Sequence, residues 1–251
     1  MPEPSALVAV LLTTWLYWRG VRTLWRRAGR GHVLHARQVV CFGLGLLTIL
    51  VALETPLDPL SGELFAAHMV QHLLLLLIAG PLLVLGAPLV PILWALPEPS
   101  RRALGGWLRR ANHLGHVGVT FTLHSVALWV WHIPALYDAA LSNRGVHVIE
   151  HASFLGTAVL FWWAVLSRGR LGYRAGVVYV FGLALESTIL GALLAFSPVA
   201  WYAAHATTTV GWGMSPLDDQ QVAGLIMWVP GGTIYLAAAL GLFAAWLRDS
   251  V

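Results

Sequence analysis

The 251-residue chain has a single cysteine, Cys41, and no lysine. One thiol excludes an internal disulfide and any two-cysteine copper or redox motif. Charged residues make up only 10% of the sequence, whereas hydrophobic residues make up 58% and the mean hydropathy is +0.74. Such a composition offers too few charges for the surface of a soluble globular domain. The chain is therefore expected to be an integral membrane protein.

Apolar segments long enough to cross a bilayer as helices, about 20 residues each, recur along the whole chain. Because they use up most of its length, the predicted fold class is an all-α polytopic transmembrane bundle of seven helices in one integral membrane domain, residues 1–251. A polar segment, 97–112, has arginine pairs around Trp107 and is expected to lie on the membrane surface as an amphipathic helix. The seven predicted spans are 6–25, 38–55, 64–87, 113–134, 146–166, 175–197 and 220–247.

The distribution of arginine predicts the topology of this bundle. All fifteen basic residues are arginine, and all except Arg144 lie at alternate connections or at the C-terminal end. By the positive-inside rule, the N-terminus lies outside and the C-terminus inside. The pI of about 9.7 then reflects arginines that face anionic lipid at the inner face, and no nucleic-acid partner is expected. Since Glu3 stands where a signal peptide has basic residues, the first span is expected to be retained.

Two similar histidine motifs open the third and fifth predicted spans. They read His-Met-Val-Gln-His at 68–72 and His-Val-Ile-Glu-His at 147–151. Residues four apart lie about 40° apart around a helix, so both imidazoles of a pair face nearly the same way. Ionisable side chains in a bilayer-length helix are costly, which makes them functional candidates. Both spans are expected to run from the outer to the inner face, so the two pairs lie at matched depth.

The predicted topology gathers further polar side chains on the outer face, together with these pairs. For any one histidine there, a hydrogen bond or a helix cap is sufficient explanation. Two pairs on separate helices favour a metal site instead, because imidazole is the commonest transition-metal ligand. Imidazole with thioether and no thiolate favours copper over zinc or iron. The candidate ligands are His68, His72, His132, His147 and His151; further candidate ligands or hydrogen-bonding partners of ligands are Met69, Gln71, Glu150, His205, Met214, Asp218 and Asp219.

Two polar residues fall within predicted spans, away from the outer face. His124 is near the middle of the fourth span and Glu186 is half way along the sixth. A carboxyl at that depth either stays neutral and hydrogen-bonds a neighbouring helix or belongs to a proton or ion path. Both alternatives stay open.

Three classes of function are consistent with the histidine motifs. The first is a protein that binds copper at the outer face and passes it on without catalysis. The second is a b-type cytochrome, in which histidines from different helices hold haem b, with His72, His124 and His151 as axial candidates. The third is a membrane zinc peptidase, because residues 147–151 match the inverted HxxEH zinc motif. The peptidase is disfavoured because Gln71 replaces the glutamate in the second copy.

Five segments from about Phe65 to Gly232 resemble, in order, the CtaG family of cytochrome c oxidase assembly factors. The resemblance implies a multi-pass protein of the bacterial plasma membrane, needed for maturation of a haem–copper oxidase and not itself an enzyme. It also implies oxidase subunits and other copper-supply proteins as partners. The segments are HMVQHLLL, GPLLVLGAP, WHIPALYDAAL, HVIEHASFLGTAVLFWW and DDQQVAGLIMWVPGG. The family motif falls here on His68, Gln71, His72, Trp131, His132, Pro134, His147, Glu150, His151, Asp219, Gln220, Met227 and Pro230.

Overall fold

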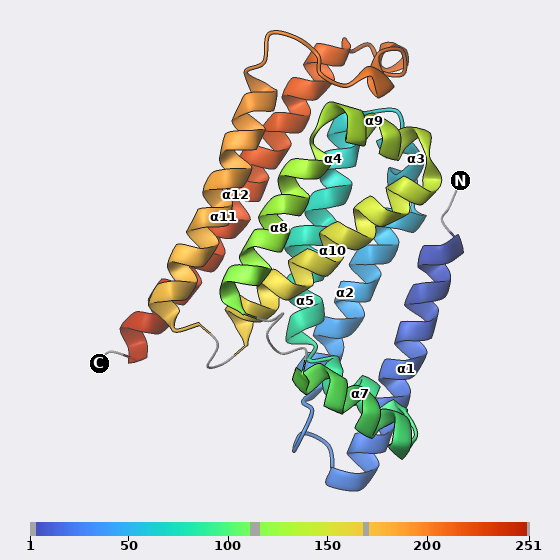
Figure 1. The fold of residues 1–251 in the computed structure, drawn as a ribbon, viewed down its shortest axis with the longest axis vertical. Coiled ribbons are helices and arrows are strands. Elements are labelled where there is room, and N and C mark those ends of the chain that lie inside the picture. Colours follow the sequence, from blue (N-terminus) through green and yellow to red (C-terminus); the bar gives the residue numbers. More distant parts are fainter. Residues whose placement is uncertain (1–3, 111–115, 168–170, 250–251) are drawn as a thin grey trace.

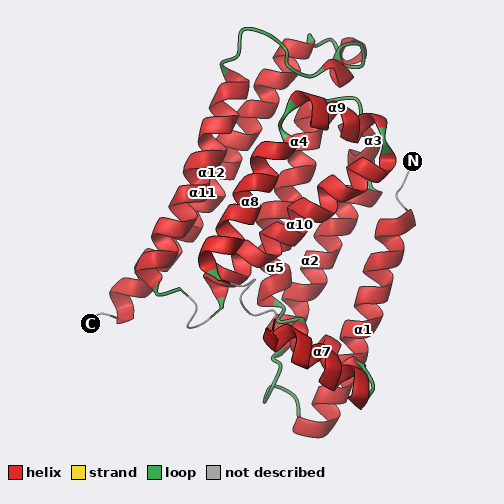
Figure 2. Ribbon diagram, viewed as in Figure 1, coloured by secondary structure: helices red, strands yellow, loops and turns green. Residues whose placement is uncertain are grey.

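The computed structural model describes residues 4–110, 116–167 and 171–249. Throughout these ranges every regular element is a helix, and Figure 2 shows the helices joined by loops. The predicted all-α fold class is therefore confirmed. The elements are α1 (Pro4–Ala28), α2 (Ala36–Glu54), α3 (Leu57–Ser61), α4 (Phe65–Leu73), the π-helix η1 (Leu74–Ala79), α5 (Gly80–Leu85), α6 (Leu89–Ala95), α7 (Glu98–Arg110), α8 (Val117–Trp131), α9 (Pro134–Ser142), α10 (Arg144–Leu166), α11 (Tyr173–Ala195), the 3₁₀-helices η3 (Ala203–His205) and η4 (Thr209–Trp212), and α12 (Pro216–Asp249).

Among the described residues, five helices are long and apolar enough to cross a membrane. They are α2, α10, α11, α12 and the continuous helix Phe65–Leu85, which comprises α4, η1 and α5. Helices α8 and α9 form a sixth span if they are counted as one, with a bend of 77° between them. The structure thus supports a membrane protein with five or six spans, whereas the count of seven and the orientation of the termini stay predictions.

The remaining predicted segments also form helices where the structure describes them. Helix α1 covers the predicted span 6–25, but the arginines in its second half, from Arg19 onward, make it less apolar than the other five. Helix α7 covers most of the predicted surface segment, and Trp107 on it is 58% exposed. Residues 111–115, with the first part of the predicted span 113–134, lie outside the described residues.

Helix α4 has neighbours on several sides, and these neighbours position the histidines. It packs against α3 and α12, while its continuation η1–α5 packs against α2 and α10. Figure 1 shows α10 crossing the bundle obliquely and α11 and α12 running side by side along its flank. These last two helices approach closely because Gly224 has no side chain: a Cβ there would lie 2.6 Å from the carbonyl oxygen of Gly191.

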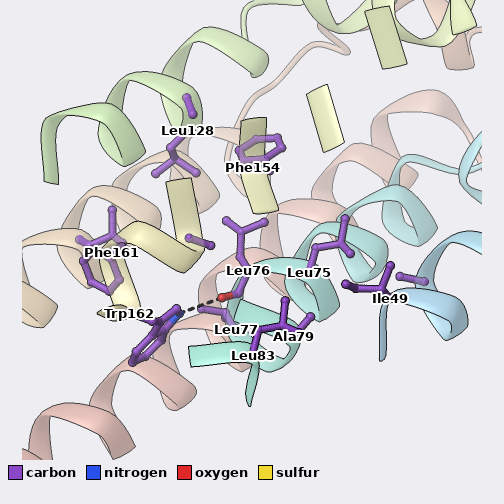
Figure 3. Packing of buried hydrophobic residues seen from close by; sticks show 14 of the residues in the cluster. Ile49, Leu75, Leu76, Leu77, Ala79, Leu83, Leu128, Phe154, Phe161 and Trp162 are labelled. Atoms are coloured by element: carbon purple, nitrogen blue, oxygen red, sulfur yellow. Dashed lines mark hydrogen bonds between the residues drawn. The ribbon is translucent and has the colours of Figure 1, made fainter. Parts of the chain in front are cut away.

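A π-helical turn connects α4 to α5. Pro81 lacks an amide N–H and its ring crowds the preceding turn, and the helix accommodates this residue with the π turn at Leu74–Ala79. The Leu76 carbonyl oxygen in this turn accepts a hydrogen bond of 2.8 Å from Trp162 Nε1 on α10. Figure 3 shows this bond among buried apolar side chains. Gly80 leaves room for the tryptophan, since a Cβ there would lie 3.1 Å from the Trp162 ring.

Trp162→Phe tests the importance of this bond between α10 and the π turn. The variant keeps an aromatic ring but leaves the buried carbonyl of Leu76 without its donor, which costs about 1–3 kcal/mol of unfolding free energy. Thermal unfolding of the protein in detergent measures this loss. Trp107→Phe, at the exposed tryptophan of α7, is the control and should change stability little; equal unfolding temperatures of the two variants would contradict the assigned role.

Candidate metal centre

Helices α4 and α10 bring three histidines and one glutamate together inside the bundle. His68 and His72 come from α4, and Glu150 and His151 come from α10. Each of these residues offers one ligand atom, and the four atoms lie within 4.8 Å of one another. None of the four residues is more than 5% exposed. We call this group, His68, His72, Glu150 and His151, the four-residue cluster.

One carboxylate oxygen lies close to both histidines of α4. Glu150 Oε1 is 3.6 Å from His68 Nε2 and 3.7 Å from His72 Nε2, which are too long for hydrogen bonds. Ligand atoms of a tetrahedral site with metal–ligand bonds of about 2.1 Å lie about 3.4 Å apart. The ring of His151 faces the same space, 5.5 Å between centroids from that of His72. The spacing therefore suits a transition-metal ion held by three imidazoles and one carboxylate.

For His72, His151 and Glu150, no hydrogen-bond partner in the described part of the chain explains the burial of the polar atoms. Among the described residues, both ring nitrogens of His72 and of His151 and both carboxylate oxygens of Glu150 are buried without a hydrogen bond. Leaving one such group unpaired costs about 1–3 kcal/mol, so native structures seldom do it. Several such groups converge on one point, an arrangement that a cation could satisfy.

The other two histidines predicted as ligands lie beside the cluster. His147 is at its edge, half-buried, with ring centroids 4.2 Å from His151 and 5.7 Å from His68. His132 ends α8, and because its Nδ1 donates 2.7 Å to the Leu128 carbonyl, the lone pair is on Nε2. His132 and His72 line one small cavity of about 30 Å³. The structure thus brings three of the five predicted ligands together and places the other two next to them.

Several of the further candidates form hydrogen bonds elsewhere. Gln71 turns away from the cluster and donates from Nε2 to the Ala52 carbonyl, 2.8 Å away on α2. Asp218 is exposed and accepts from Ser215 ahead of α12. Met214 is in the loop before that helix, whereas Met69 is buried and lines the cavity beside the cluster.

Asp219, another of those candidates, is fully buried and caps α4. Its carboxylate accepts hydrogen bonds from the backbone amides of Phe65, at 2.6 Å, and Ala66, at 3.0 Å. These are first-turn amides that the helix itself leaves without an acceptor. Asp219 therefore fixes the end of the helix from which His68 and His72 project.

His205 supports the cluster through Tyr137. Its Nδ1 donates 3.3 Å to the Glu63 carbonyl, so its Nε2 accepts the 2.8 Å hydrogen bond from the Tyr137 hydroxyl. Burial lowers the pKa of His205, which keeps it neutral and able to accept. The ring of Tyr137 in turn packs edge-on against His68, 5.0 Å between centroids. No sequence pattern predicts this role for Tyr137, because a single tyrosine in an apolar segment has no characteristic spacing.

The two mid-span residues lie outside the cluster. His124 donates from Nδ1 to Thr157 Oγ1, 2.9 Å away, because that hydroxyl gives its own proton to the Ser153 carbonyl. Its ring also stacks on Phe161. Glu186 is half-buried on α11, a helix that contributes none of the four cluster residues.

The profile of one protein family, described as cytochrome c oxidase caa3 assembly factor (Caa3_CtaG), matches residues 15–249. Uncharacterized proteins of Mycobacterium bovis and Mycobacterium tuberculosis are each 23% identical over 278 aligned residues, which cover 99% of this chain and 42% of theirs. One of Mycobacterium leprae is 23% identical over 238 residues, 89% of this chain and 36% of that one. The chain thus spans less than half the length of these relatives. No solved structure matches it.

Proposed function

Because the chain belongs to the family of cytochrome c oxidase caa3 assembly factors, we propose that it binds copper at the four-residue cluster and passes it to the oxidase. The observation that carries the proposal is the convergence of buried, unpaired nitrogen and oxygen atoms from α4 and α10. Such atoms become satisfied when a cation binds among them.

The donor set and its surroundings favour copper. Three imidazoles and a carboxylate bind Cu, Zn or Fe, and a thioether beside them shifts the preference toward Cu(I). A buried thioether, Met69, lies on the same helix between His68 and His72. Haem–copper oxidases need copper for maturation, so a copper ion is the cargo that links this site to the family's pathway. Delivery requires binding and release without turnover, so we do not propose an enzyme.

The two alternative functions gain no support from the site. The cavity beside His72, about 30 Å³, has room for a water molecule and not for a porphyrin. A larger apolar groove of about 420 Å³ reaches His151, but no second histidine from the described ranges lines it. For a zinc peptidase, Glu150 should act as a base beside the ligands, whereas here its oxygen lies among them, 3.6 Å from His68 Nε2.

The proposed location is the bacterial plasma membrane, with the cluster toward the outer face and the arginine-rich connections toward anionic lipid. In this orientation the exposed arginine side of α7 lies at the inner surface. The oxidase subunits that receive copper, and the proteins that supply it, would approach from the outer side. Reconstitution with separated oxidase subunits would identify the acceptor.

Metal analysis and an optical spectrum of protein purified in detergent test the proposal. We expect copper near one equivalent at the cluster and no Soret band, and at least tenfold weaker copper binding, roughly, after His72→Ala or His151→Ala. Oxidase activity in cells should fall with copper occupancy. His32→Ala, at an exposed histidine outside the bundle core, is the matched control. Full copper binding in the double variants of residues 68 and 72 or of 147 and 151 would refute the site, and a Soret band would indicate a b-type cytochrome.

A further inference from the structure

A second set of metal-binding side chains surrounds the 30 Å³ cavity next to the four-residue cluster. Two methionines and two histidines line it: Met69 and His72 from α4, His132 at the end of α8, and Met227 from α12. The hydroxyl-bearing residues Ser187 and Tyr235 complete its polar wall, and the rest is apolar. His72 is the residue that this cavity shares with the four-residue cluster.

His132 presents a nitrogen lone pair that nothing in the described protein uses. It is 6% exposed, and its Nε2 is buried without a hydrogen bond. Its Nδ1–H is bound to the Leu128 carbonyl at 2.7 Å. Metal-binding histidines are commonly held in this way, with one nitrogen donating to a backbone carbonyl so that the other faces the metal. The ring is therefore fixed in the tautomer that a metal ligand requires.

The two methionines supply soft donors at the same place. Met69 is 2% exposed and Met227 is 5% exposed, and they approach the cavity from different helices. Methionine also fills irregular cores, so its presence alone decides nothing. Two thioethers and an unpaired imidazole around one water-sized space, however, are the ligand types that select Cu(I).

We propose that this cavity is a Cu(I) site in which Met69 Sδ, Met227 Sδ and His132 Nε2 are the ligands. The inference rests on the proposed copper function and adds a second position for the ion. His72 stands between the two sites, so an ion can move from the cluster to the cavity by exchanging ligands one at a time. The ion stays Cu(I) throughout, so the step needs no oxidant or reductant. The cavity then holds copper for release, while the cluster accepts the next ion.

Anaerobic Cu(I) titration of the purified full chain against a chromogenic chelator tests the proposal. The wild type should bind two equivalents, and the double variant Met69→Leu/Met227→Leu should bind one. Leucine has nearly the volume of methionine, so the core should tolerate the change. X-ray absorption of the loaded wild type should show copper–sulfur scattering that the double variant loses. Met214→Leu, in the loop before α12, is the matched control and should keep both equivalents and the sulfur signal.

The possible outcomes separate this site from the cluster. A double Leu variant that keeps both equivalents or the sulfur signal overturns the Cu(I) site. The wild type could also bind a single equivalent that is lost in Glu150→Gln and kept in the double Leu variant. That result overturns the Cu(I) site, because copper then binds only at the cluster, and it upholds the proposed function. No copper binding in the wild type overturns both. The complementary variant Glu150→Gln should keep the sulfur signal and lose the other equivalent.

Discussion

Glu150→Gln is expected to weaken copper binding at the four-residue cluster by at least tenfold, roughly, while the copper-free protein keeps or gains stability. Glu150 Oε1 is the oxygen that lies 3.6–3.7 Å from the nitrogens of both α4 histidines. Glutamine has nearly the same shape but no charge, so the site loses its anionic ligand. In the copper-free state the same change removes a fully buried carboxyl that has no hydrogen-bond partner among the described residues. The substitution therefore separates ligand binding from folding.

Two measurements on the purified protein show this separation. Copper titration gives the affinity, and thermal unfolding with and without copper gives the stabilisation that the ion provides, which should largely disappear in the variant. Glu186→Gln is the matched control, since it changes a half-buried glutamate on a helix outside the cluster. An affinity equal to that of the wild type would mean that Glu150 is not a ligand. A large loss of stability without copper would mean that the carboxylate has a structural role.

Much of the helical architecture could be predicted because a membrane helix needs a long apolar segment. The predicted span 64–87 corresponds to the helix Phe65–Leu85, and 146–166 corresponds to Arg144–Leu166. The hydropathy of α1 is a weaker indicator of a span, because arginines lie within this helix. The 77° bend between α8 and α9 falls immediately before Pro134, a residue that favours such a break. Hydropathy does not report it, because the segments on both sides are apolar.

The cluster could be predicted only in part, for a geometric reason. The four-residue spacing within each histidine pair fixes their common direction, and the structure does bring His68, His72 and His151 together. Whether α4 and α10 face each other does not follow from chain order. On α10, Glu150 and His151 lie about 100° apart, so they flank the side that faces α4. His147 lies one turn away and is left at the edge of the cluster.

Asp219→Ala is expected to lower the free energy of unfolding by about 2–4 kcal/mol and to weaken copper binding as well. The Asp219 carboxylate accepts hydrogen bonds from the amides of Phe65 and Ala66, 154 and 153 residues away in the chain. Alanine leaves both first-turn amides without an acceptor in an environment that excludes water, and it removes a negative charge from the N-terminal end of α4. His68 lies on the first turn of this helix, so an unanchored end displaces a proposed ligand.

Asp218→Ala is the matched control for this prediction, because the two aspartates are neighbours on α12 and differ in burial. Asp218 is exposed and accepts from Ser215, so its loss should change stability little and leave copper affinity unchanged. Asp219→Asn keeps one acceptor oxygen and should fall between the two. Thermal unfolding and copper titration in detergent should show the largest loss in Asp219→Ala, a smaller loss in Asp219→Asn and the smallest in Asp218→Ala, if Asp219 positions the cluster. If Asp219→Ala lost stability but bound copper as tightly as the wild type, the cap would stabilise the bundle without positioning His68, and the cluster would depend on α10 and the π turn alone.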